Sequence, residues 1–165
     1  MRLVLLRHAH ALPGEVDGIR PLSAKGRRQV RSLPGAVIKE ALKGVKILEH
    51  SGLVRSFETA QLLKKHFKVK VPLQKLEGIE PEASAKLTAR KLAQSKGHRL
   101  IVGHNPHLSC LVGMLLGLKA GSQGIKFRKA GIVALERTAK ASTKCFYGQW
   151  RLLWMIVPLN DTANS

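Results

Sequence analysis

Two short, uninterrupted apolar runs constrain the fold of this chain most strongly. They are LVLL at residues 3–6 and LIV at residues 100–102. A strand that is apolar at every residue is typical of a parallel sheet covered by helices on both faces. We therefore expect the first run to be a central strand of such a sheet and the second run to be another short buried strand.

Amphipathic segments alternate with the apolar runs along the chain. Residues 53–67 carry apolar side chains at helical spacing, which predicts a strong amphipathic helix. Further helices are expected over 23–33, 36–43, 84–97 and 106–118, and further strands over 45–50, 131–137 and 148–158, with 69–83 extended or loop-like. Pro34 and Gly35 interrupt the first helical region, which leaves either one kinked helix or two. The alternation predicts an α/β protein, a three-layer α/β/α sandwich around a mostly parallel central sheet.

The length and the cysteines bound the organisation of the chain. We expect one domain over residues 1–158 and a polar tail over 159–165. Cys110 and Cys145 form neither a CxxC pair nor a metal-ligand cluster, which favours a reducing compartment. The N-terminal apolar run is too short for a signal peptide, and residues 108–118 are too few to span a bilayer. These features predict a cytoplasmic monomer without a membrane segment.

The charge is strongly one-sided, with 29 Lys and Arg against 10 Asp and Glu and a formal net charge of +19. Such a surface attracts anions, which include nucleic acids, acidic proteins, phosphorylated molecules and anionic membranes. The chain shows no zinc-finger spacing and no aromatic residues interleaved with basic ones, and its basic residues are scattered over the whole length. A specific nucleic-acid partner is therefore not expected. Charge alone does not choose among the other anions, but the residues that follow the predicted strands favour a phosphoryl-bearing substrate.

Arginines and histidines follow the predicted strands. Arg7 and His8 end the first strand, His104 ends the strand at 100–102, and Arg20 and Arg55 follow the loops after the first two strands. In open α/β sheets, ligands bind outside the carboxyl ends of the strands. Guanidinium groups fit phosphate oxygens, one imidazole can accept a phosphoryl group, and a second can stabilise the transferring oxygens. The set predicts phosphoryl transfer to a histidine and then to water, with arginines supplying the positive charge and no metal or cofactor required.

Four short motifs carry a family resemblance. They are LLRHA at 5–9, RPLSAKG at 20–26, SGLVRSFETA at 51–60 and LIVGHNP at 100–106. In this order they resemble the signatures of the histidine phosphatase superfamily, and their order, spacing and short length most resemble its SixA-type phosphohistidine phosphatase branch. The resemblance covers roughly residues 1–118 and implies a phosphoglycerate mutase-like fold.

The resemblance also implies roles for individual residues. His8 corresponds to the nucleophile that becomes phosphorylated, and Arg7, Arg20 and Arg55 match the arginines that bind phosphate. His104 matches the second histidine of the phosphate site. The implied catalytic set is therefore His8, Arg7, Arg55 and His104, without a metal.

Three features depart from the family pattern or leave it open. Ala9 replaces the usual glycine after the nucleophile, and would strain the loop if a positive φ were needed there. Gly52 replaces the usual proline of the turn before Arg55, which makes that turn less rigid. Family members that cleave esters use a carboxyl group to protonate the leaving alkoxide, and the candidates for it here are Glu80 and Glu77, with Glu82 beside them.

The sequence predicts a metal-independent phosphatase acting on phosphohistidine, more specifically on a phosphohistidine-bearing protein, because an imidazole leaving group depends less on a general acid. Small phosphate esters, nucleotides and polyphosphate are the alternative substrates. A binding module that has lost turnover through Ala9 is the alternative outside catalysis. His10 and His107 lie beside the two proposed site histidines, and we expect them to flank the site and not to complete a metal centre.

Overall fold

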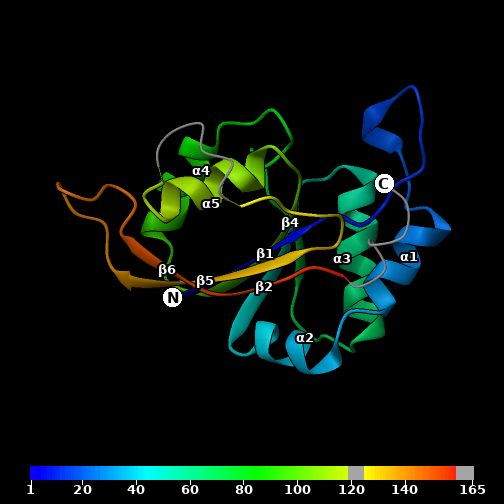
Figure 1. Cartoon of the computed structure of the whole chain (residues 1–165), viewed down its shortest axis with the longest axis horizontal. Coiled ribbons are helices and arrows are strands. Elements are labelled where there is room, and N and C mark those ends of the chain that lie inside the picture. The colour runs from blue at the N-terminus through cyan, green and yellow to red at the C-terminus, as the bar shows by residue number, and fades with distance from the viewer. Residues whose placement is uncertain (119–124, 159–165) are drawn as a thin grey trace.

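A six-stranded sheet forms the centre of the protein in the computed structural model, which describes residues 1–118 and 125–158 (Figure 1). The strand order is β3-β2-β4-β1-β5-β6. The strands are β1 Arg2–Arg7, β2 Val45–His50, β3 Leu73–Lys75, β4 His98–Gly103, β5 Ile132–Ala139 and β6 Gln149–Ile156. The first four are mutually parallel, and β5 and β6 add an antiparallel side next to β1. The expected polar tail at 159–165 lies outside the described residues.

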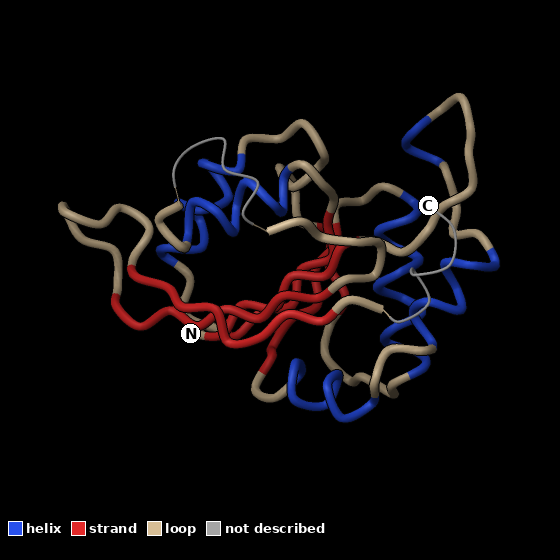
Figure 2. Tube along the Cα trace, in the orientation of Figure 1, coloured by secondary structure: helices blue, strands red, loops and turns tan. Residues whose placement is uncertain are grey.

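Helices cover both faces of this sheet (Figure 2). The helices are α1 Ala24–Arg31, α2 Gly35–Leu42, α3 Val54–His66, α4 Ala85–Gln94 and α5 His107–Leu115, with a 3-10 turn η1 at Asp17–Ile19. Apolar residues of α1, α2 and α3 pack on one face, and those of α4 and α5 pack on the other. The predicted three-layer α/β/α sandwich with a mostly parallel sheet is therefore confirmed. Among the described residues, no helix has the length and apolar character needed to cross a membrane.

The first apolar run lies where its composition predicts. Leu3 and Leu5 of β1 belong to the apolar cluster with α4 and α5, and Val4 and Leu6 belong to the cluster with α1, α2 and α3. All four side chains are 0% exposed. Since successive side chains of a strand point to opposite faces, one apolar run supplies both cores and places β1 in the middle of the molecule.

Two local signals define the helical layer near the site. α1 ends at Arg31, and Pro34 occupies the N-cap position of α2, so two helices form and not one kinked helix. Ser23 caps α1 by accepting a hydrogen bond from the N–H of Gly26 at 3.1 Å. A Cβ atom on Gly26 would lie 2.0 Å from the carbonyl oxygen of His10. Only glycine therefore lets α1 pack this closely on the loop that follows β1.

Candidate active site

The pairing of two parallel strands brings the two predicted site histidines together. Arg7 of β1 lies opposite Gly103 of β4, and the N–H of His8 donates a 2.9 Å hydrogen bond to the Gly103 carbonyl. His8 and His104 are the next residues after these two strands. Their ring centroids lie 4.8 Å apart, with the rings inclined at 46°.

His8 is held as a neutral imidazole with one defined tautomer. Its Nδ1 lies 2.7 Å from the carbonyl oxygen of Ala9. A carbonyl can only accept, so Nδ1 carries the proton and Nε2 keeps its lone pair. Burial, reinforced by the charge of Lys129 and by His104, lowers the pKa of His8 to about 2. The ring is therefore uncharged at neutral pH, with Nε2 available as a nucleophile.

His104 is also buried and neutral. Its Nε2 lies 2.5 Å from Oγ of Ser51, a buried residue that follows β2. Burial lowers the pKa of His104 to about 3, and the charge of Arg55 acts in the same direction. Ser56, the residue after Arg55, donates a hydrogen bond from its hydroxyl to the carbonyl of Val102 at 2.8 Å. This bond connects the start of α3 to β4. Ser51 lies in one of the four motifs but is not among the predicted site residues.

Asp17 joins two of the predicted arginines. Arg55, in the first turn of α3 and 4% exposed, donates to the Asp17 carbonyl at 2.6 Å and to the Asp17 carboxylate at 2.8 Å. Arg20 donates to the other carboxylate oxygen at 3.0 Å. The hydrogen bond from Arg55 holds the pKa of Asp17 below its usual range. Asp17 shows no signal in the sequence pattern, and it supplies the anion that neighbouring guanidinium groups need.

Lys129 is a second residue of the site that is not among the predicted ones. Its Nζ lies 3.3 Å from Nε2 of His8. Burial lowers the pKa of Lys129 to about 8, and the charges of Arg7, Arg55 and Arg20 add to this effect. A topological signal could have found it, because β5 runs antiparallel to β1 and therefore begins at the edge where the parallel strands end.

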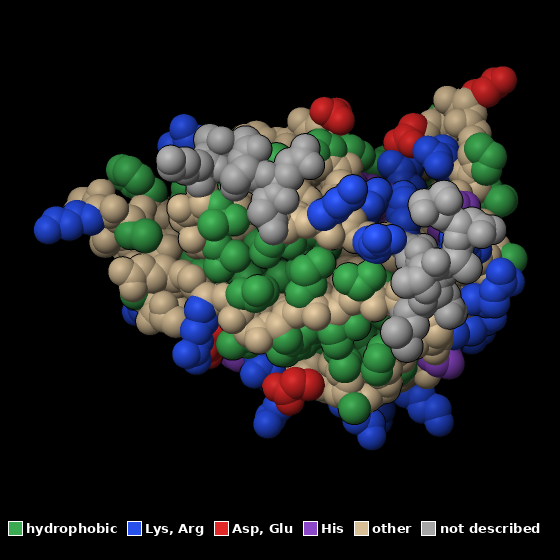
Figure 3. Space-filling view, viewed as in Figure 1, with side chains coloured by type: hydrophobic (Ala, Val, Ile, Leu, Met, Phe, Trp, Pro, Cys, Tyr) green, Lys and Arg blue, Asp and Glu red, His purple; other side chains and the backbone are tan. Residues whose placement is uncertain are grey.

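All five predicted site residues thus meet at one edge of the sheet. Arg7 donates from its guanidinium to the carbonyl of Phe127 at 2.8 Å, just beyond the end of β1. Arg20 and Arg55 share the carboxylate of Asp17, and the charges of all three arginines lower the pKa of Lys129, which contacts His8. Figure 3 shows Lys and Arg side chains gathered beside a histidine at the end of the molecule where α1 and α3 lie.

The two departures from the family pattern have different structural outcomes. Ala9 is buried, donates from its N–H to Oγ1 of Thr59 at 3.1 Å, and is not among the described residues with positive φ. The loop therefore does not need a glycine at this position. Gly52 has φ of +86°, a backbone conformation that the ring of a proline excludes. The turn before Arg55 therefore differs from one built on proline.

The candidate general acids lie in the segment between β3 and α4. Glu77 is exposed and forms a 2.7 Å ion pair with Lys75. Glu80 accepts from the N–H of Gly78 at 3.1 Å, and Glu82 is exposed. The carboxylate that contacts the arginines of the site is instead Asp17. A role for Glu80 or Glu77 as general acid stays a prediction.

The flanking histidines have partners of their own. Nδ1 of His10 lies 2.8 Å from Oγ of Ser23, and Nδ1 of His107 lies 3.0 Å from the carbonyl of Ala83. Across residues 1–118 and 125–158, no group of three or more His, Cys, Asp or Glu side chains could hold a metal ion.

Solved structures of known proteins share this architecture. The protein histidine phosphatase SixA complexed with tungstate matches with a TM-score of 0.75 at 21% identity, over 97% of this chain and 99% of that one. A SixA from Agrobacterium tumefaciens, described as a candidate phosphohistidine phosphatase, matches with a TM-score of 0.74 at 21% identity, over 95% and 97% of the chains. The chain has the fold of SixA. A mycobacterial glucosyl-3-phosphoglycerate phosphatase complexed with VO3 shares this fold less closely, with a TM-score of 0.61 at 17% identity, over 93% and 97% of the chains. No protein-family model matches the chain, and no curated protein matches it in sequence.

The two low histidine pKa values predict that acid destabilises the folded protein. Below the unfolded-state value of about 6.5, an unfolded histidine binds a proton that folded His8 or His104 does not bind. Stability that is present above that pH is therefore lost as the pH falls toward 3. Each of the two histidines should contribute a slope of up to about 1.4 kcal/mol per pH unit between pH 6 and pH 4.

Urea unfolding measured at intervals from pH 7 to pH 4 checks this prediction. Burial also lowers the pKa values of His50, His98 and His107, so the whole slope has several contributors. The variant His8→Gln isolates the contribution of His8. It should reduce the slope of the free energy of unfolding by up to about 1.4 kcal/mol per pH unit, which corresponds to one proton. An unchanged slope in this variant would show that folded His8 titrates like an unfolded histidine.

Proposed function

We propose that this chain is a histidine phosphatase that hydrolyses a phosphoryl group through a covalent intermediate on His8, within a single domain at residues 1–158. One observation carries the proposal. The unprotonated Nε2 of His8 lies beside His104 and among the cationic groups of Arg7, Arg55 and Lys129. A neutral nucleophile surrounded by fixed positive charge suits a phosphoryl group and the negative charge on its oxygens.

The geometry supports two successive displacements at phosphorus. In the first, the lone pair of His8 Nε2 forms a bond to phosphorus as the bond to the leaving group breaks. The ring becomes a phosphoimidazolium, whose remaining N–H still donates to the Ala9 carbonyl. In the second, water forms a bond to phosphorus, the Nε2–P bond breaks, and its electron pair returns to Nε2. The water oxygen and its protons leave with the phosphate, which then releases a proton to solvent.

The arginines supply the positive charge in both steps. Arg55 donates one N–H group to the Asp17 carbonyl and another to the Asp17 carboxylate, and the same two groups can form a fork on two phosphate oxygens. The Asp17 side chain is 58% exposed, so its carboxylate can move into water when a phosphoryl group takes its place. Arg7 contributes from the end of β1, and Arg20 contributes from the rim of the site through its contact with Asp17. His104, at the end of β4, is neutral and adds a ring nitrogen for hydrogen bonding instead of charge.

Phosphohistidine is the substrate that these groups favour. The carboxyl group in contact with the arginines is that of Asp17, whose pKa Arg55 lowers, and such a group is a poor proton donor for an alkoxide. A protonated phosphohistidine releases a neutral imidazole and needs no such donor. The structural likeness to SixA, named as a protein histidine phosphatase, supports the same choice.

A small phosphate ester is the second candidate substrate. It is favoured by the likeness to a glucosyl-3-phosphoglycerate phosphatase and, at a TM-score of 0.65 and 15% identity, to a phosphoserine phosphatase from Entamoeba histolytica. In that case Glu80 or Glu77 would have to reach the leaving group from the segment between β3 and α4. Nucleotides and polyphosphate belong to this alternative. A binding module without turnover is less well supported, because Ala9 adopts its conformation without a positive φ.

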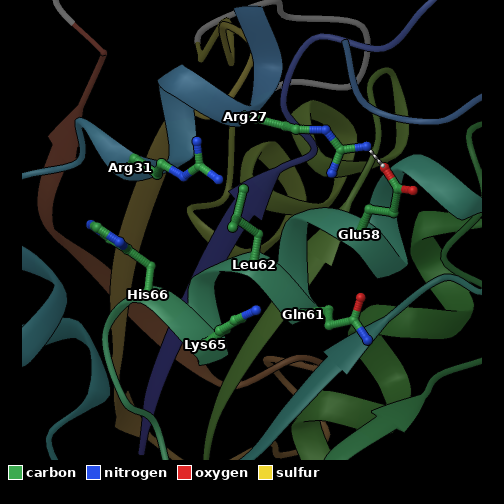
Figure 4. Close-up of a pocket in the computed structure, with 7 residues that line it drawn as sticks. All are labelled: Arg27, Arg31, Glu58, Gln61, Leu62, Lys65 and His66. Carbon is green, nitrogen blue, oxygen red and sulfur yellow. Dashed lines mark hydrogen bonds and ion pairs between the residues drawn. The ribbon is translucent and has the colours of Figure 1, made fainter. Parts of the chain in front are cut away.

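A basic groove between α1 and α3 supports a protein as the carrier of the phosphoryl group (Figure 4). It has a volume of about 640 Å³ and is lined by Arg27, Arg31, Glu58, Gln61, Leu62, Lys65 and His66. Its one carboxylate, that of Glu58, accepts from the N–H of Leu22 at 2.8 Å and pairs with Arg27 at 3.3 Å. Both helices begin next to the site, α1 at Ala24 after the cap Ser23 and α3 at Val54 beside Arg55, so the groove leads away from it. An acidic segment of a phosphoprotein could occupy the groove while its phosphohistidine reaches His8.

Removing the nucleophile tests the proposed reaction. His8→Ala should lose at least about 1,000-fold in hydrolysis of a phosphohistidine protein, because the variant lacks the nucleophile of the covalent step. Wild type should retain full activity in EDTA and should carry acid-labile label on His8 after a rapid quench with labelled substrate. His98→Ala, at the opposite end of β4 from His104, is the matched control and should retain activity. Hydrolysis of esters alone would contradict the phosphohistidine assignment, and activity only with added metal would contradict the mechanism.

Charge reversal in the groove tests the protein carrier. The double variant Arg31→Glu and Lys65→Glu should lower kcat/KM for a phosphohistidine protein at least about tenfold, since two attractive contacts become repulsive. It should leave the hydrolysis of phosphoimidazole, which cannot span the groove, within about twofold of wild type. Lys140→Glu with Lys144→Glu makes the same change in net charge on the exposed β5–β6 connection and serves as the control. Equal losses in the two double variants would assign the effect to overall charge and not to the groove.

A further inference from the structure

We propose that Lys129 is a catalytic residue that acts chiefly in the second displacement, where it stabilises Nε2 of His8 as that atom leaves phosphorus. The inference rests on the proposed function and adds a residue and a step to it. Its basis is the contact between the ammonium group of Lys129 and the one atom of His8 that would bond to phosphorus.

The direction of this contact is defined by the groups on either side. Nδ1 of His8 donates to the Ala9 carbonyl, so Nε2 can only accept. An ammonium group can only donate, so the 3.3 Å contact is a hydrogen bond from Lys129 Nζ to the Nε2 lone pair. In the ligand-free site, Lys129 is therefore hydrogen-bonded to the Nε2 lone pair. This is also the state that follows when the Nε2–P bond of the intermediate breaks. A group that stabilises this arrangement favours dephosphorylation of His8.

The backbone around Lys129 is attached to the strand that carries His8. The carbonyl of Phe127, a residue 0% exposed, accepts from the guanidinium of Arg7 at 2.8 Å. On the other side, the N–H of Ala130 donates to the Arg7 carbonyl at 3.1 Å, and the Gly131 carbonyl accepts from the Arg7 N–H at 3.0 Å. The backbone on both sides of Lys129 is thus attached to β1, which places its side chain within reach of the reacting atom.

Geometry also separates Lys129 from the leaving group of the first displacement. In an in-line displacement, the leaving group departs on the side of phosphorus opposite the nucleophile. A group 3.3 Å from Nε2 lies on the nucleophile's side, within reach of the oxygens around phosphorus but not of the leaving atom. When the Nε2–P bond forms, the hydrogen bond from Lys129 to Nε2 must break. When the Nε2–P bond breaks, this hydrogen bond forms again. Lys129 should therefore accelerate the decay of the intermediate more than its formation.

The charges that surround Lys129 make its protonation sensitive to moderate alkali. It faces His8 and Arg7 from β1, Arg20 and Asp17 from the following loop and η1, Arg55 from α3, and His104 from the end of β4. Burial and the arginines lower its pKa to about 8, with Asp17 acting in the opposite direction. Above that pH the ammonium group loses its proton and can no longer neutralise charge at the site.

The test compares Lys129→Met and Lys129→Arg with Lys126→Met, which removes an exposed lysine from the same segment. Each protein is mixed in excess with a ³²P-labelled phosphohistidine protein, and the label on His8 is followed by rapid quench. We expect the decay of phospho-His8 to slow about 100-fold in Lys129→Met, in line with the loss of one charged donor at a transition state. Its formation should slow by a smaller factor, so the labelled fraction rises. Lys129→Arg should retain most of the decay rate, and Lys126→Met should match wild type.

The pH dependence gives a second readout, which a purely structural role would not move. In wild type the decay rate should fall at alkaline pH, above the value of about 8 that applies to the ligand-free site, because the phosphoryl oxygens of the intermediate raise the pKa of Lys129. This fall should be absent in Lys129→Met and shifted to still higher pH in Lys129→Arg. Decay slowed no more than formation in Lys129→Met, or an unchanged basic limb, would overturn the role of Lys129 while leaving the proposed function intact. Hydrolysis by wild type without any label on His8 would overturn the proposed covalent route and the role of Lys129 together.

Discussion

The parallel pairing of β1 with β4 is the constraint on which the site depends. The register that sets Arg7 opposite Gly103 makes His8 and His104 the next residues on adjacent strands. The hydrogen bond from the His8 N–H to the Gly103 carbonyl continues this pairing by one residue beyond β1. A one-residue shift would turn one of the two rings to the opposite face of the sheet. The apolar side chains of both strands oppose such a shift, because they fill the cores on both faces.

Burial and positive charge then act on His8 in the same direction. Loss of water around the ring and the neighbouring Lys129 both disfavour the imidazolium form, so the nucleophile stays unprotonated at neutral pH. A phosphoryl group reverses this balance, because its negative oxygens compensate the cations and favour the positive ring of the phosphoimidazolium. Asp17 performs part of that compensation in the ligand-free site, where it accepts from both Arg20 and Arg55. The site thus combines an uncharged nucleophile with cations whose repulsion is reduced by an exposed carboxylate.

The sequence predicts the parts of this site that follow strands. Arg7, His8 and His104 end apolar runs, and the rule that ligands gather at the carboxyl edge of a parallel sheet brings them together. Asp17 and Lys129 follow no strand and show no periodicity, so their contribution depends on loop conformations that the sequence pattern does not reveal. Lys129 also depends on the antiparallel direction of β5, which places the start of that strand at the same edge. The glutamates between β3 and α4 were predicted as candidate general acids. Their position in the sequence, next to a predicted helix, does not determine their distance from His8.

A crystal structure with tungstate, a tetrahedral oxyanion like phosphate, tests the central claim most directly. We expect tungsten to bind next to Nε2 of His8, with its oxygens contacting Arg7, Arg55 and His104. We also expect the guanidinium of Arg55 to have exchanged the Asp17 carboxylate for the anion. Tungstate bound only in the α1–α3 groove, with Arg55 still paired to Asp17, would contradict the account.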